Sequence, residues 1–314
     1  MKVIFMGTPD FAVPILEGLI ENYEVILVVS QPDKKVGRHQ ILKETPVKML
    51  AKANNIEVFQ PSKIREDYKR IIDLSPDIIV TCAYGQIIPK EVLECPRLGC
   101  INVHASLLPK LRGGAPIHKA LIDGYEKTGI TIMYMDEKMD NGDIISKREI
   151  DILDSDNLES LHDKLSVLGK ELLLDTLPSI IDGTNNREVQ NEEEVTYAYN
   201  IKREEEHLDF TKTSREIFNQ IRGLSPYPSA NAILFGEEMK ILDSKILNKK
   251  YNAEEGVIVD ITKEGIVVST SDGAIILTKV KPFGKKLMDA ISYVNGVGKD
   301  KLLGEKFKWK RLSN

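Results

Sequence analysis

The sequence has no long hydrophobic run. Hydrophobic residues make up 42% of its 314 residues, yet no apolar stretch approaches the roughly 18 residues that a membrane-spanning helix needs. Pro9, Asp10 and Pro14 interrupt the apolar start of the chain, and no cleavage site of small residues follows, which argues against a signal peptide. We therefore expect a globular cytoplasmic protein, long enough for two domains.

Cysteine is also scarce. The three cysteines, Cys82, Cys95 and Cys100, form an odd and sparse set, which argues against a disulfide framework and for a reducing compartment. Cys95 and Cys100 lack the paired spacing of a zinc site, and the histidines have no ligand-like spacing. We therefore expect no bound metal.

The first turn lacks the glycines of a dinucleotide site. In Gly7-Thr8-Pro9-Asp10, Gly7 permits a tight turn and Thr8 can cap a helix. No second glycine allows a pyrophosphate to approach, which weakens a dehydrogenase interpretation. Pro14 lies inside the helical pattern that follows and is expected to kink it.

The chain as a whole has no excess of basic charge, since its formal net charge is −5. Residues 1–200 carry 23 Lys and Arg against 32 Asp and Glu, whereas residues 201–314 carry 20 against 16. A basic tail on an acidic body is typical of a protein whose one end meets a phosphate backbone. A solvated lysine-rich surface explains the charge alone equally well.

The first half of the chain alternates strand-like and helix-like segments. Five apolar runs predict strands that are covered on both faces, at Lys2–Met6, Glu24–Val29, Asp77–Thr81, Cys100–Val103 and Ile130–Met135. Helices are predicted at Phe11–Glu21, Val47–Asn54, Glu66–Leu74 and Ala115–Asp123. This alternation predicts an α/β domain with a doubly wound, parallel sheet.

The second half has a different pattern. Turn-forming residues and acidic runs at 183–206 indicate a boundary between domains, which we place as residues 1–189, a linker at 190–206, and residues 207–314. After a helix at Ser214–Arg222, β-rich runs at Gly256–Ile261, Gly265–Ser269 and Ala274–Val280 are separated by Gly and Asp turns. They predict a small antiparallel barrel.

Three polar residues stand out near the ends of predicted strands. Asn102 and His104 flank Val103 and should face the same side of their strand. Asp140 precedes Gly142 in a turn after the strand Ile130–Met135, so its carboxylate could reach His104. Taken singly, such residues are more often caps or turn formers, and only the joint pattern favours a catalytic site.

This trio suits attack by an amine on a formyl carbon. Asn102 can donate a hydrogen bond to the oxyanion that forms, a contact typically worth about 3–4 kcal/mol in the transition state. His104 can take or donate the proton. Asp140 can orient the imidazole or hold a water that carries the proton. No covalent intermediate is needed, because the amine is itself the nucleophile.

Two segments carry a family resemblance. INVHASLLPKLRGGAPI and TGITIMYMDEKMDNGDII resemble the signature of the folate-dependent formyltransferase family. Within the family, the chain is similar to members that formylate the methionine of initiator tRNA, and this similarity covers essentially the whole chain. It extends over MGTPDFAVPIL, SQPDKKVGR, VTCAYGQIIPKEVL, VTYAYNIKREEEHLDF and IRGLSPYPSA.

The resemblance implies a fold and an activity. It implies a Rossmann-like formyltransferase domain with a mostly parallel sheet, followed by a C-terminal β-barrel similar to an OB-fold that binds tRNA. It implies 10-formyltetrahydrofolate as formyl donor, no metal, and initiator methionyl-tRNA as acceptor for translation initiation. The family's catalytic residues match Asn102, His104 and Asp140. We expect a monomer.

The resemblance also assigns binding residues. The folate pocket of relatives matches two segments, Tyr84, Gly85, Gln86 and Ile87, and Ser106, Leu107, Leu108 and Pro109. The loop Asp33–Thr45 matches an insertion that reaches the acceptor stem of tRNA, with Arg38 as its key residue, flanked by Lys34, Lys35 and Lys43. Without the resemblance this loop would be a solvated basic turn.

The chain departs from the family at four positions. Relatives often carry an aromatic residue at Leu111, Ala at Gly114, Gln at His118 and Trp at Tyr227. The catalytic trio is untouched, whereas loop packing and substrate contacts around these positions are put in question.

Two alternatives stay open. The first is a formyltransferase for another amine, such as glycinamide ribonucleotide or an amino sugar, which the trio cannot distinguish. The second is an RNA-binding protein with a degenerate enzyme domain, because an OB-like domain often serves only to bind nucleic acid. The intact trio argues against the second.

Overall fold

The computed structural model describes residues 1–37 and 40–308, which form two compact units. The first unit contains Met1–Pro116, Lys127–Asp151 and His162–Tyr199. The second contains Ile117–Glu126, Ile152–Leu161 and the chain from Asn200 onward. In the described ranges, every helix is too short or too polar to cross a membrane.

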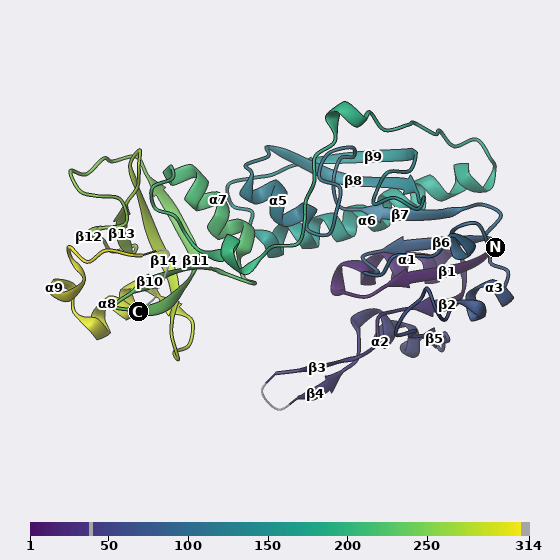
Figure 1. The fold of residues 1–314 in the computed structure, drawn as a ribbon, viewed down its shortest axis with the longest axis horizontal. Helices are drawn as coiled ribbons and strands as arrows, with labels where there is room; N and C mark the ends of the chain where they lie inside the picture. The colour runs from purple at the N-terminus through teal and green to yellow at the C-terminus, as the bar shows by residue number, and fades with distance from the viewer. Residues whose placement is uncertain (38–39, 309–314) are drawn as a thin grey trace. The chain divides into compact units, whose positions relative to one another are not determined.

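A seven-stranded sheet forms the core of the first unit, in the order β5-β2-β1-β6-β7-β8-β9 (Figure 1). Its strands are β1 (Lys2–Gly7), β2 (Glu24–Val29), β5 (Val58–Phe59), β6 (Ile78–Cys82), β7 (Cys100–His104), β8 (Lys127–Tyr134) and β9 (Ile144–Asp151). Strands β5 to β7 in this order run parallel, whereas β8 and β9 are antiparallel to their neighbours. The prediction of a mostly parallel sheet is confirmed.

Helices cover both faces of the parallel part of this sheet, which explains why its central strands are apolar throughout. They are α1 (Val13–Asn22), α2 (Pro46–Ala53), α3 (Lys69–Asp73), α4 (Lys90–Leu93) and α6 (Leu158–Ile181). The short helix α5 (Pro116–Ile122) belongs, from Ile117 onward, to the second unit. Ile4 and Met6 of β1 pack with residues of α3 and α4. On the opposite face, a Cβ built on Gly169 of α6 would lie 3.1 Å from Val103 and 3.3 Å from Ile15.

Several elements of the first unit differ from the sequence predictions. Pro14 does not kink a helix, because a short 3-10 turn at Asp10–Ala12 precedes α1 and leaves Pro14 in its first turn, where its missing N–H costs nothing. The long helix α6 was not predicted. Strand β9 was also missed, because it alternates buried and exposed residues as an edge strand that is covered on one face.

The second unit is built on an antiparallel sheet in the order β10-β11-β14-β13-β12, with β15 paired to β14. Its elements are α7 (Ser214–Leu224), β10 (Ala230–Leu234), β11 (Glu237–Leu247), β12 (Ile258–Ile261), β13 (Ile266–Ser269), β14 (Ala274–Pro282), β15 (Met288–Asp289), α8 (Ala290–Val297) and α9 (Lys299–Leu302). The segment after α9 bridges both edges, since Phe307 bonds Gly256 and Lys308 bonds Ile233. This closure forms the predicted small antiparallel barrel.

Candidate active site

Strand β7 carries Asn102 and His104 at the place where the sheet changes from parallel to antiparallel. β6 pairs with β7 in parallel and β8 pairs with it antiparallel, so that His104 lies opposite Thr131 and Asn102 opposite Met133. The two side chains are two residues apart and therefore project from the same side of the strand. They lie near its carboxyl end, where open α/β sheets bind ligands.

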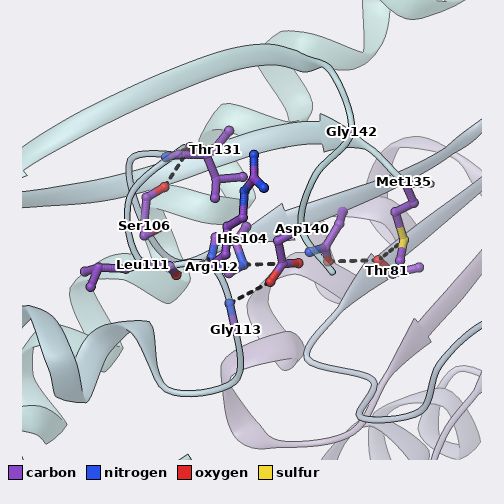
Figure 2. Close-up of polar contacts among 12 residues, drawn as sticks. Thr81, His104, Ser106, Leu111, Arg112, Gly113, Thr131, Met135, Asp140 and Gly142 are labelled. Carbon is purple, nitrogen blue, oxygen red and sulfur yellow. Dashed lines mark hydrogen bonds and ion pairs between the residues drawn. The ribbon is translucent and has the colours of Figure 1, made fainter. Parts of the chain in front are cut away.

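His104 and Asp140 meet, as the sequence predicts. His104 is 6% exposed, and its Nδ1 lies 3.7 Å from Oδ1 of Asp140 (Figure 2). Its Nε2 lies 3.1 Å from the carbonyl oxygen of Leu111. Because a carbonyl only accepts, Nε2 carries the proton of the neutral ring and Nδ1 is the nitrogen that can take another. The Asp140 carboxylate is placed on the Nδ1 side of the ring.

The loops that hold these two groups have unusual backbone conformations. Asp140 and Leu111 have φ values of +49° and +60°, in the left-handed region that side chains disfavour. The second carboxylate oxygen of Asp140, Oδ2, accepts a 2.8 Å hydrogen bond from the backbone N–H of Gly113 (Figure 2). A Cβ on Gly142 would lie 2.0 Å from the carbonyl oxygen of Tyr134, so this turn requires glycine.

Asn102 is oriented by a residue that sequence reasoning missed. Thr81 of β6 is in register with Asn102, and its hydroxyl donates to Asn102 Oδ1 at 2.8 Å. The amide nitrogen of Asn102 has no hydrogen-bond partner among residues 1–37 and 40–308, so it is the group available to an oxyanion. The available signal was a hydroxyl inside the otherwise apolar strand Ile78–Cys82.

The first expected folate segment, Tyr84 to Ile87, follows β6. Tyr84 is buried, its carbonyl accepts from Thr8 and Gln31, and burial raises the pKa of its phenol. Gly85 has φ +88°. The side chain of Gln86 bonds the backbone at Ile64 and Pro61, whereas Ile87 is 65% exposed. Ile87 therefore offers apolar surface, and Gln86 mainly holds the loop.

The second expected folate segment, Ser106 to Pro109, follows β7. The Ser106 hydroxyl donates to the carbonyl of Lys110 at 2.6 Å, and Thr131 ties the backbone of Ser106 and Leu108 to β8. Leu108 is buried in a small apolar cluster. Leu107 is partly exposed, and Pro109 completes the turn. The two segments expected to bind folate thus leave the carboxyl ends of neighbouring parallel strands.

The expected tRNA loop contains a hairpin that was not predicted. Strands β3 (Lys34–Val36) and β4 (Ile41–Lys43) pair so that Lys34 lies opposite Lys43 and Lys35 opposite Leu42. The three lysines are exposed, as are Ile41 and Leu42. Arg38 lies outside the described residues.

Three other positions that the sequence singled out are His118, Tyr227 and Gly114. His118 Nδ1 bonds the carbonyl of Gly223 at 2.8 Å, and burial lowers the pKa of its ring. Tyr227 is 77% exposed, and Gly114, shortly before α5, is also exposed. Within the described part of the chain, no group of three or more His, Cys, Asp or Glu side chains is arranged to hold a metal ion.

Comparison with known sequences gives consistent results. The sequence profile described as "Formyl transferase" matches residues 1–177, and "Formyl transferase, C-terminal domain" matches residues 200–298. The chain is 52% identical over 308 residues to the methionyl-tRNA formyltransferase of Macrococcus caseolyticus, which covers 98% of each chain. It is 53% identical over 299 residues to that of Bacillus subtilis, which covers 94% of each.

Solved structures share the fold. A sugar 3N-formyltransferase crystallised with dTDP and 5-N-formyl-THF has a TM-score of 0.69 and 22% identity, covering 91% of this chain and 99% of its own. The N-formyltransferase of Helicobacter canadensis, in complex with folinic acid and dTDP-3-aminofucose, has a TM-score of 0.70 and 22% identity, covering 90% and 100%. With two matching profiles and relatives over half identical along nearly its whole length, this chain belongs to the formyl transferase family.

Proposed function

We propose that the chain transfers the formyl group of 10-formyltetrahydrofolate to the free amino group of methionyl initiator tRNA, for translation initiation. The observation that carries this proposal is the pairing of His104 with Asp140 beside an oriented Asn102, in a chain 52% identical to a methionyl-tRNA formyltransferase over 308 residues. We further propose that it acts as a monomer in the cytoplasm.

Each member of the trio has one task in this proposal. His104 Nδ1 takes the proton of the attacking amine, because its other nitrogen already donates to the Leu111 carbonyl. Asp140 stabilises the imidazolium that results, at 3.7 Å. Asn102 donates its amide N–H to the oxygen that becomes negative, and Thr81 keeps that amide from turning.

The surroundings of the trio fit a folate. The donor supplies the formyl carbon when bound. Ile87 gives an exposed apolar surface after β6, and the Ser106–Pro109 turn gives a fixed backbone edge after β7. An aromatic ring system with polar edges needs both. We therefore propose that Tyr84, Gly85, Gln86 and Ile87, together with Ser106, Leu107, Leu108 and Pro109, hold it.

The lysine hairpin supports an RNA acceptor. Like charges directly opposite each other, as in the Lys34 and Lys43 pair, destabilise a free hairpin and are relieved when an anion binds. We propose that Lys34, Lys35 and Lys43, with Arg38, contact tRNA phosphates. We also propose that residues 1–189 form the catalytic domain, 190–206 the linker and 207–314 a tRNA-binding domain.

The test is formyl transfer from 10-formyltetrahydrofolate to charged initiator tRNA, elongator methionyl-tRNA, glycinamide ribonucleotide and an amino sugar nucleotide. We expect efficient formylation of the initiator tRNA alone. Weak, equal binding of both tRNAs with formylation of a small amine would replace the proposed acceptor. Binding of tRNA with no transfer to any amine would favour the degenerate, RNA-binding alternative.

A further inference from the structure

The segment 188–199, at the end of the first unit, runs along both active-site loops. Glu188 exchanges two backbone hydrogen bonds with Ile144, just after the Asp140 turn, at 2.8 and 2.9 Å. Further on, Thr196 accepts from the N–H groups of Leu111 and Arg112, each at 2.9 Å. The segment is therefore hydrogen-bonded to the loop that holds Asp140 and to the loop that holds the His104 ring.

Gln190 lies between these two attachments and is 5% exposed. Its amide nitrogen donates to the carbonyl oxygens of Asp140 at 2.9 Å and Gly142 at 2.8 Å. Its amide oxygen accepts from Nε and Nη2 of Arg112 at 3.1 and 2.9 Å. Both donors and both acceptor positions of the Gln190 carboxamide thus have protein partners.

Arg112 completes the connection. It is 3% exposed, and besides Gln190 its guanidinium donates to Asn141 at 3.2 Å and to Glu192 at 2.9 Å. Asn141 belongs to the same turn as Asp140. The loop after β7 and the turn after β8 are therefore joined through one arginine and one carboxamide.

We propose that Gln190 is a positioning residue of the active site, which holds the Asp140 turn against the Arg112 loop so that the carboxylate faces His104. Because it assigns a role within formyl transfer, this inference rests on the proposed function. It gives one buried residue of the segment that leads out of the first unit a part in positioning the catalytic groups.

The backbone of Asp140 explains why such a clamp is needed. A non-glycine residue at φ +49° is strained and keeps that conformation only where its surroundings hold it. The carbonyl of this same residue is one of the two that Gln190 binds. If the turn relaxes, Asp140 loses both its 2.8 Å bond from Gly113 and its 3.7 Å approach to His104.

Two substitutions separate the two halves of the carboxamide. Gln190→Met removes every hydrogen bond at similar length, whereas Gln190→Glu keeps an acceptor for Arg112 but loses the donors to Asp140 and Gly142. We expect both to lower kcat by about 10- to 100-fold, as for a catalytic group displaced by about 1 Å, with the KM for folate and tRNA nearly unchanged. The control is Val189→Ala, at a 78% exposed neighbour.

A double-mutant cycle with Asp140→Asn tests whether Gln190 acts through Asp140. We expect Gln190→Met to slow the Asp140→Asn variant by no more than about threefold, because residues that act as one unit are not additive. If the two single-variant losses in kcat multiply in the double variant, the role of Gln190 is merely structural. If Gln190→Glu has the wild-type kcat, Gln190 only pairs with Arg112. Either result overturns the inference.

A measurement independent of activity keeps this inference apart from the proposed function. Hydrogen exchange at the Gly113 amide should be faster in both Gln190 variants than in the wild type, while exchange in β14 stays the same. Wild-type protein that formylates no amine would refute the proposed function only. Unchanged exchange at Gly113 in both variants would refute the role of Gln190.

Discussion

The active-site loops and the β3–β4 hairpin, both in the first unit, are built in opposite ways. Around His104 the polar side chains of Ser106, Arg112 and Gln190 are buried, and hydrogen bonds hold Leu111, Gly113 and Asp140. On the hairpin, Lys34 and Lys43 are exposed and lie opposite each other. Proton transfer requires fixed geometry, whereas recognition of a polyanion requires accessible charge.

The comparison predicts the largest effect at His104. We expect His104→Ala to lower kcat by about 10²- to 10⁴-fold, the usual contribution of general acid–base catalysis, with little change in folate KM. Steady-state kinetics measures this. The matched control is His162→Ala, since His162 Nδ1 also lies near a carboxylate, 3.0 Å from Asp163, but there the carboxylate side chain is 73% exposed. Equal rates for His104→Ala and wild type would remove this histidine from the mechanism.

The next largest effect is expected at Asn102, whose amide Thr81 orients. We expect Asn102→Ala to lower kcat by about 10²- to 10³-fold, as for the loss of one oxyanion donor. Thr81→Val should lower kcat by less, because the amide is kept but can turn. Thr128→Val is the control, since the Thr128 hydroxyl is buried without a partner in the described structure and its loss should leave kcat unchanged. A Thr81→Val enzyme with wild-type kcat would contradict the orienting role.

A smaller effect, on the KM for tRNA and not on kcat, is expected from changes in the β3–β4 hairpin. The double substitution Lys34→Ala and Lys43→Ala should raise the KM for tRNA by roughly tenfold, since an exposed ion pair is worth at most about 1 kcal/mol, with kcat and folate KM unchanged. The salt dependence of log K for tRNA should weaken by roughly two units of slope. Lys63→Ala with Lys90→Ala is the control, because both lysines already face glutamates. A lower kcat with an unchanged KM for tRNA would contradict the contrast between the hairpin and the active-site loops.

The smallest effect tests whether burial alone makes a histidine functional. His118 is bonded to a backbone carbonyl and burial lowers the pKa of its ring below the usual 6.5. As the pH falls below 6.5, His118 takes up a proton in the unfolded chain before it does so in the folded protein. The neutral ring therefore contributes fully to folding stability above pH 6.5, and this contribution is lost as the pH falls. His118→Asn should flatten this pH dependence in urea unfolding and leave kcat unchanged. An identical pH dependence in both proteins would refute this assignment.

The sequence alone was sufficient for the sheet and for part of the site. Continuous apolar runs marked the strands that are covered on both faces, because that pattern is a direct result of two-sided burial. Spacing by two put Asn102 and His104 on one side of β7. The glycine after Asp140 marked a turn that could bring the carboxylate back to His104, and the structure places these groups 3.7 Å apart.

Only the tertiary structure decided which residues hold that trio in place. Thr81, Leu111 and Gln190 act through hydrogen bonds across 21, 7 and 50 positions of the chain, and no local periodicity encodes such contacts. Two of these bonds use backbone carbonyls, which every residue carries, so residue type does not reveal them. Segment 190–206, which composition marks as a linker, gains its function only because folding lays Gln190 between two strained loops.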